Sequence, residues 1–280
     1  SSRRRHTRYG TVTGVQTCAL PICMEYLIIA LAAASAAGLT FFSGFGLGTV
    51  LLPVLALFFP VELAVALTAL VHLLNNLLKV ALLGRHADRR TLVLFGFLAM
   101  VGAYAGAQVL LWLAGREPLV SYRLGPLECQ VTPVKLTVAM LLLGFTLGDL
   151  LPGRETILIG RGPLMVGGLL SGFFGGLSGH QGALRSAVLI RFGLVKEQFL
   201  GTSVVLACLV DLTRLSVYAP GFLWERLLER PDILATAVGG ALLGTLLGYR
   251  LLPKVTLGGI RALVSVLVGA LALGLGLGVL

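Results

Sequence analysis

The chain has 280 residues, of which 57% are hydrophobic and 12% charged, and its formal net charge at pH 7 is +10. Soluble domains carry about 25% charged residues, so this composition excludes an ordinary water-soluble protein. The Lys and Arg residues lie mostly in short connectors between apolar blocks, where they set the topology of membrane proteins. We therefore expect an all-α polytopic protein with the lipid bilayer as its partner and no nucleic-acid binding.

Residues 1–23 differ in character from everything that follows. They open with the basic stretch SSRRRHTRYG and contain VTGVQTCALPI, which resembles the translation of a common DNA sequencing-library adapter. A targeting peptide needs a longer apolar region than CALPIC provides, and the hydrophobic periodicity is poor for an ordered membrane-surface segment. We interpret residues 1–23 as a non-native extension and expect a chain that starts at Met24 to insert normally.

Eight apolar blocks follow, which predicts about eight transmembrane helices, because a bilayer-spanning helix needs ~20 apolar residues. The blocks lie near residues 25–59, 62–83, 91–114, 134–151, 162–192, 197–219, 232–251 and 260–280. The longest connector, 116–133, divides them into two sets of four. We assign 24–115 with 134–151 to a first transmembrane half and 160–280 to a second, in a multi-pass protein of the bacterial inner (cell) membrane.

The two halves look like copies of one unit. The segments Ser43–Lys79 and Ser178–Arg214 are equally long, and aligning them without gaps pairs Glu62 with Glu197 and Asn76 with Asp211. Internal structural repeats are common in secondary transporters. The pattern therefore favours a repeat of two four-helix halves, whose relative orientation the sequence leaves open.

The first block of each half is too long and too rich in glycine for one straight helix. Interruptions are expected at Gly38, Gly44, Gly46, Gly48 and Pro53 in the first half, and at Gly172, Gly175, Gly176, Gly179 and Gly182 in the second. Broken helices at matching positions mark the binding site of many transporters. Close helix packing, which small residues permit, is the alternative explanation for the glycines.

These same residues carry a resemblance to a known family. The stretches GLTFFSGFGLGTVLLPVLALFFP and GGLLSGFFGGLSGHQGALRSAVLI, within the two-half layout of Met24–Leu280, resemble the sulfite exporter family, the TauE/SafE-type membrane transporters. The resemblance implies transport of a sulfur-containing anion such as sulfite or an organosulfonate. It implies no residue role beyond what the polar positions themselves indicate.

The candidate substrate-binding residues are polar or backbone-exposing groups at the two breaks and on the helix after the first break. Arg185 leads, because a cation beside the free N–H groups of a helix start suits an anion; an interfacial position is the alternative. The full set is Ser43, Gly44, Gly46, Asn75, Asn76, Ser178, Gly179, His180, Gln181 and Arg185. His72 and Lys79 share a helix face with the two asparagines, and Asp211 with Arg214 is predicted to form a structural salt bridge.

The sequence carries no nucleotide-binding glycine loop followed by Lys-Ser/Thr and no HExxH zinc motif. We expect no enzyme activity, no cofactor and no metal. The favoured function is secondary transport of a small anion by alternating access. A carrier or channel for another small solute and a non-transporting membrane scaffold remain as alternatives. The coupling ion, proton or sodium, the membrane orientation and the oligomeric state are left open.

Overall fold

The computed structural model describes residues 22–43, 47–125, 127–150, 159–220, 230–251, 268–270 and 272–279. The helices are α1 (Ile22–Ser43), α2 (Leu47–Ala56), α3 (Val61–Leu83), α4 (Arg89–Thr91), α5 (Phe97–Ala114), α6 (Pro133–Leu150), α7 (Arg161–Ser178), α8 (Gln181–Arg191), α9 (Lys196–Tyr218) and α11 (Pro231–Leu251). A 3₁₀ turn, η1 (Gly84–His86), follows α3, and a π-helical turn, η2 (Leu92–Gly96), joins α4 to α5. Most of the predicted non-native extension, residues 1–21, lies outside the described residues.

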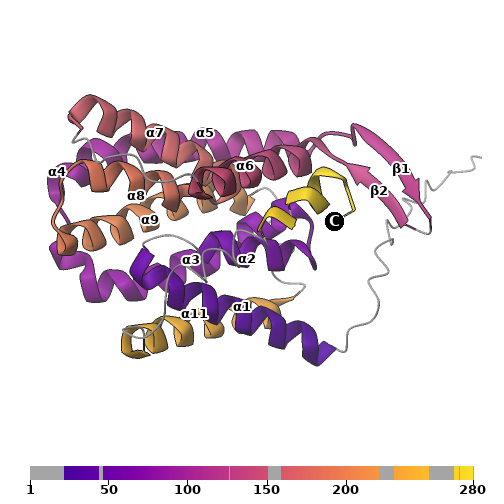
Figure 1. The fold of residues 1–280 in the computed structure, drawn as a ribbon, viewed down its shortest axis with the longest axis horizontal. Coiled ribbons are helices and arrows are strands. Elements are labelled where there is room, and N and C mark those ends of the chain that lie inside the picture. Colours follow the sequence, from indigo (N-terminus) through magenta and orange to yellow (C-terminus); the bar gives the residue numbers. More distant parts are fainter. Residues whose placement is uncertain are drawn as a thin grey trace, which may run out of the picture.

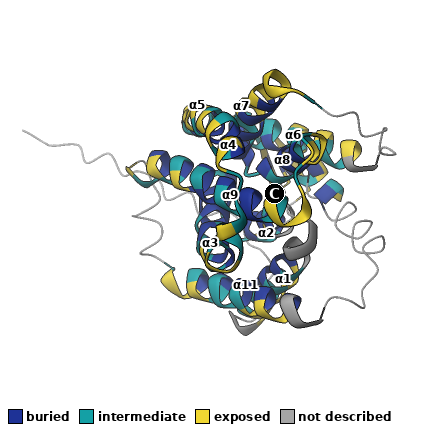
Figure 2. Cartoon of the chain, turned by 90° about the vertical axis from the view of Figure 1, so that its left-hand side faces the viewer, coloured by how far each residue is buried: buried dark blue, intermediate teal, exposed yellow. Residues whose placement is uncertain are grey.

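The described helices have the length and composition of membrane spans. Val61–His86, Arg89–Ala114, Lys196–Tyr218 and Pro231–Gly248 are long and apolar enough to cross a bilayer, and Met24–Gly38 and Pro133–Gly148 are shorter apolar helices. Exposed residues lie on the outward faces of the helices (Figure 2). Among them are large apolar ones, such as Val93, Phe97, Trp112, Met140 and Leu243. Lipid tails accept such a surface, whereas water does not. The protein is therefore an integral membrane protein of helices, and the number eight stays a prediction.

The helices form layers in which the two predicted halves are interleaved. In Figure 1, α5 and α7 lie side by side along one face, α3 and α9 occupy the middle, and α1 and α11 form the opposite face. Thus α1, from the predicted first half, packs along α11 from the second, while α7 from the second packs along α5 from the first. The middle pair also takes one helix from each half.

Glycines bring the paired helices unusually close. A Cβ atom added to Gly172 on α7 would stand 1.9 Å from the carbonyl oxygen of Ala99 on α5, and one added to Gly244 on α11 would stand 1.9 Å from that of Ala34 on α1. Only a residue without a side chain permits such an approach between helix backbones. Close packing is therefore the role of these two glycines.

The long first block of each predicted half is broken, but at fewer glycines than expected. Helix α7 is continuous through Gly172, Gly175 and Gly176, and Gly182 lies inside α8. Similarly, Gly38 lies inside α1, and Gly48 and Pro53 lie inside α2. The expectation that these residues interrupt the helix was wrong, because most of the glycines serve packing while the backbone hydrogen bonds continue.

The actual interruptions lie at related positions in the two halves. Helix α1 ends at Ser43 and α2 begins at Leu47, whereas α7 ends at Ser178 and α8 begins at Gln181. The same shift along the sequence that carries Ser43 onto Ser178 also carries the end of α2 onto that of α8, and both ends of α3 onto those of α9. The break, short helix and long helix thus recur at the spacing of the sequence repeat. The equivalence of the complete four-helix halves stays a prediction.

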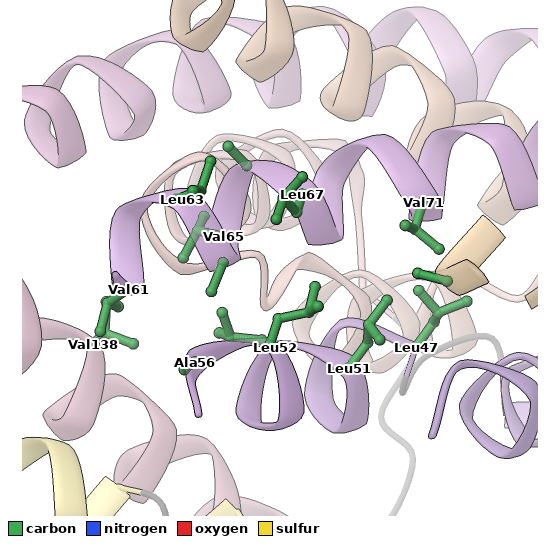
Figure 3. Close-up of a cluster of buried hydrophobic side chains, with 14 of the residues drawn as sticks. Leu47, Leu51, Leu52, Ala56, Val61, Leu63, Val65, Leu67, Val71 and Val138 are labelled. Carbon is green, nitrogen blue, oxygen red and sulfur yellow. The ribbon is translucent and has the colours of Figure 1, made fainter. Parts of the chain in front are cut away.

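An apolar layer fixes the short helix α2 on α3. Leu51 and Leu52 of α2 point toward α3, and Val65 and Val71 lie on the side of α3 that faces α2 (Figure 3). The leucine and valine side chains here are at least nine-tenths buried. Burial of such a side chain is worth about 1.5–3 kcal/mol in water, and inside a bilayer the close packing itself takes over this role. The contact holds the piece of chain that follows the first break in place.

The predicted connector at 116–133 contains a β-hairpin that the sequence patterns did not predict. Strand β1 (Val120–Leu124) pairs antiparallel with β2 (Leu127–Val131). The backbone N–H of Gln130 donates to the carbonyl of Gly278 at 3.1 Å, and the Tyr122 hydroxyl donates to the carbonyl of Leu277. The hairpin is therefore attached to the last described helical turn, which lies beside it in Figure 1.

Candidate functional site

A group of polar side chains is buried where α3, α8 and α9 meet, and we call it the central polar cluster. Its members share three properties: they lie at membrane depth, they are largely hidden from solvent, and they come from both predicted halves. They are His72, Asn75, Asn76 and Lys79 on α3, His180, Gln181 and Arg185 at the start of α8, and Asp211 and Arg214 on α9. Polar and ionisable groups at such depth are costly and usually serve function.

Asp211 is the centre of the hydrogen-bond network in this cluster. Its Oδ1 accepts from Arg214 Nε at 3.0 Å and Nη2 at 2.7 Å, and from Gln181 Nε2 at 2.9 Å. Its Oδ2 lies 2.6 Å from Nδ1 of His72 on α3. The predicted Asp211–Arg214 salt bridge is confirmed. The same carboxylate also joins α9 to α8 and to α3, which stabilises the buried charge.

The break between α7 and α8 is shaped by Gly179. This residue has φ +82°, and its N–H closes α7 by donating to the carbonyl of Gly175 at 2.9 Å. Glycine adopts this left-handed conformation at helix ends without the cost that a side chain imposes. Arg214 Nη1 also donates to the Gly175 carbonyl at 3.2 Å. The network around Asp211 thus holds the break as well as the helices.

The first half also reaches this break. A Cβ atom added to Gly48, the second residue of α2, would stand 3.1 Å from the carbonyl oxygen of Gly179. The short helix that follows the first break therefore touches the second break. Of the predicted first-half residues at this place, Ser43 ends α1 but its side chain is not described, and Gly44 and Gly46 lie outside the described residues.

Two buried basic side chains of the cluster come from different predicted halves. Lys79 on α3 and Arg185 on α8 are 3% and 2% exposed. Arg185 Nη1 donates to Gln181 Oε1 at 3.0 Å, which fixes one side of its guanidinium. With Arg214 the cluster holds three cations against the single carboxylate of Asp211. Among the described residues of the cluster, the formal charge is thus +2 when the histidines are neutral.

Buried polar atoms without a hydrogen-bond partner within the described part of the chain occur in the cluster. Among them are Nε2 of His180 and Nδ2 of Asn75. Their side chains are nevertheless held in place: His180 Nδ1 lies 3.0 Å from the Ser178 carbonyl, and Asn75 Oδ1 accepts from Thr245 Oγ1 at 2.6 Å. The His180 ring also stacks on Phe145 of α6, with 5.7 Å between ring centroids. Buried polar atoms without a partner are rare and call for an explanation.

The structure brings together most of the predicted site residues that it describes. Gln181 and Arg185 bond to each other, and Asn76 connects to them through His72 and Asp211. Ser178 is buried, but its hydroxyl donates to the Phe174 carbonyl of its own helix at 3.0 Å. The prediction did not include Lys79 or Asp211 in the site. The shared helix face of Lys79 and the two asparagines was the available signal for the lysine, whereas the contacts of Asp211 arise only from tertiary packing.

Long apolar helices around a buried, positively charged polar cluster beside a broken helix define an integral membrane protein with the organisation of a transporter. The sequence matches the family described as Sulfite exporter TauE/SafE over residues 27–275. The chain therefore belongs to this family of membrane transporters. Neither the curated proteins nor the solved structures gave a match to it.

Proposed function

We propose that the protein is a secondary transporter of a small oxyanion, sulfite or an organosulfonate, which works by alternating access in the bacterial inner membrane. The observation that carries this proposal is the burial of three basic side chains, Lys79, Arg185 and Arg214, in one cluster with the single carboxylate of Asp211. Burying an excess of basic groups is unfavourable unless a further negative charge joins them. A dianion such as sulfite would balance the +2 charge of the cluster, and a sulfonate would balance half of it.

The proposed binding group surrounds the break between α7 and α8. Arg185 supplies the charge and a planar fork of donors that suits an oxyanion. The unpartnered Asn75 Nδ2 supplies a further donor, and His180 Nε2 becomes one when its ring is protonated. The start of α8 adds backbone N–H groups with their partial positive charge. The proposed binding residues are Ser43, Gly44, Gly46, Asn75, Asn76, Ser178, Gly179, His180, Gln181 and Arg185.

The test is counterflow of radiolabelled sulfite in proteoliposomes that contain the purified full chain. We expect Arg185→Gln to lower the apparent sulfite affinity by about one to two powers of ten, because a charged hydrogen bond contributes about 1.5–3 kcal/mol. Arg185→Lys should recover only part of the affinity, since an ammonium replaces the fork. Arg191→Gln is the matched control, because Arg191 is an exposed cation at the other end of the same helix.

The outcomes separate the parts of the proposal. Absence of sulfite and methanesulfonate counterflow by the wild type would contradict anion transport. Flux that neither saturates nor exchanges would indicate a channel instead of a carrier. Normal sulfite affinity in Arg185→Gln would remove Arg185 from the site and make a neutral solute the better candidate.

A further inference from the structure

His72 occupies a position in the central polar cluster that the anion-binding proposal does not use. Its ring bonds through Nδ1 to Asp211 Oδ2 at 2.6 Å, so it ties α3 to α9 across the two predicted halves. The amide nitrogen of Asn76 lies 3.2 Å from Nδ1 and 3.3 Å from Nε2. Because Nδ1 is bonded to Asp211, Nε2 is the ring nitrogen left to accept from this amide. The ring therefore contacts both the buried carboxylate and one of the proposed anion-binding residues.

The protonation state of this ring decides where the Asn76 amide can bond. A neutral imidazole has one donating and one accepting nitrogen. When Nδ1–H donates to Asp211, the lone pair on Nε2 accepts from the Asn76 amide. A proton that binds at Nε2 turns this atom into a donor, and two facing donors cannot bond. The Asn76 amide must then turn away from the ring.

We propose that His72 couples transport to protons: a proton bound at Nε2 releases the Asn76 amide to the substrate anion, so that proton and anion bind together and cross together. The inference rests on the proposed anion transport. A bound anion in turn stabilises the imidazolium, because coupling between two binding sites is reciprocal. The proton enters from water on the side to which the cluster is open. It leaves to water on the opposite side after the protein has closed the first side and opened the second.

The surroundings of His72 suit this role. Its side chain is 13% exposed, whereas that of Asp211 is fully buried, so the ring is the more accessible of the two groups. The charged groups of neighbouring elements that act on the ring are Asp211 and Arg214 of α9 and Arg185 of α8, and Lys79 lies two turns further along α3 itself. Burial opposes a charge on the ring most strongly, Asp211 stabilises that charge, and the cations oppose it. An anion beside Arg185 cancels part of that opposition, which links the two binding events.

The experiment compares two modes of sulfite transport in the same proteoliposomes. Counterflow at equal pH on both sides measures anion binding and exchange, and uptake with an acidic exterior measures proton coupling. In the wild type we expect the acidic exterior to raise initial uptake severalfold and a protonophore to abolish this gain. His72→Gln should still catalyse counterflow, with a weaker sulfite affinity because Asn76 is no longer released, and should lose the gain, because a neutral amide carries no proton. His86→Gln, a histidine in the turn after α3, should behave as the wild type.

Each result has a distinct meaning. Wild-type counterflow without any response to the pH gradient overturns proton coupling but leaves anion transport standing, whereas absence of wild-type counterflow contradicts the transport proposal itself. A pH response that persists in His72→Gln overturns the role of His72, since the proton then travels on hydrogen sulfite. If His72→Gln does not insert, His72→Asn provides the same comparison with a shorter amide.

Discussion

The close approach between α1 and α11 gives a sharp test of the packing. Gly244→Ala would place a methyl group 1.9 Å from the carbonyl oxygen of Ala34, where ordinary contact begins at 3.4 Å. The helices must therefore separate locally until the methyl group reaches ordinary contact, or the new group must force a comparable backbone shift. Gly239→Ala is the matched control on the same helix, because a Cβ atom there meets nothing within 4 Å.

Two opposing effects on stability decide the outcome for these variants. Replacing a helical glycine by alanine favours the helix by roughly 0.5–1 kcal/mol, and this gain is common to both variants. Overpacking costs typically about 1–3 kcal/mol and applies to Gly244→Ala alone. The gap between the two variants should therefore be about 1–3 kcal/mol, with Gly239→Ala equal to or more stable than the wild type.

The assay is the temperature at which half of the detergent-solubilised protein loses its monodisperse peak in size-exclusion chromatography. Gly244→Ala should melt several degrees below Gly239→Ala. Equal midpoints for the two variants would mean that α1 and α11 do not approach each other as described, and the interleaved arrangement of the halves would lose its support on this face.

Two further predictions concern the central polar cluster. Asp211→Asn removes the one carboxylate from a cluster that keeps three cations, so the free energy of unfolding should fall by about 3–5 kcal/mol. The assay would show this as a loss of monodisperse protein. The control Glu128→Gln breaks the exposed Arg123–Glu128 pair and should leave the melting midpoint unchanged. Gly179→Ala and Gly125→Ala both place a side chain at positive φ, at +82° and +62°, and should each cost about 1–2 kcal/mol. Only Gly179→Ala should also reduce sulfite counterflow, because Gly179 shapes the break between α7 and α8 whereas Gly125 lies in the hairpin turn. Equal counterflow in both variants would mean that the break is not needed for transport.

The membrane helices and the position of the second break could be predicted because their signals are local. Uncharged runs of sufficient length specify spans, and Gly179 follows the last helical residue as a helix-ending glycine does. The roles of the other glycines could not be assigned in this way. Gly172 and Gly179 are equivalent by composition, and only the approach of α5 shows that the first serves packing.

The contacts of the candidate site were predictable to a smaller extent. The Asp211–Arg214 pair lies at a spacing that places both side chains on one face of a helix, so the sequence indicated it. The bond from His72 to Asp211 joins residues 139 positions apart, and no pattern in either helix specifies which partner the other half provides. The hairpin was missed because its strands are short and lie in a connector that was judged only by its charge and length.

The interleaved packing also sets an order for assembly during synthesis. Ala99 and Gly172, which meet between α5 and α7, both lie in the middle of the chain, whereas Ala34 and Gly244, which meet between α1 and α11, lie near its opposite ends. The first pair can form as soon as α7 has entered the membrane. Helix α1 must wait until nearly the whole chain has been translated before its glycine-rich partner arrives. During that interval its small-residue face is open to lipid or to the corresponding helix of another nascent chain. Misassembly therefore starts most easily at this stage of synthesis.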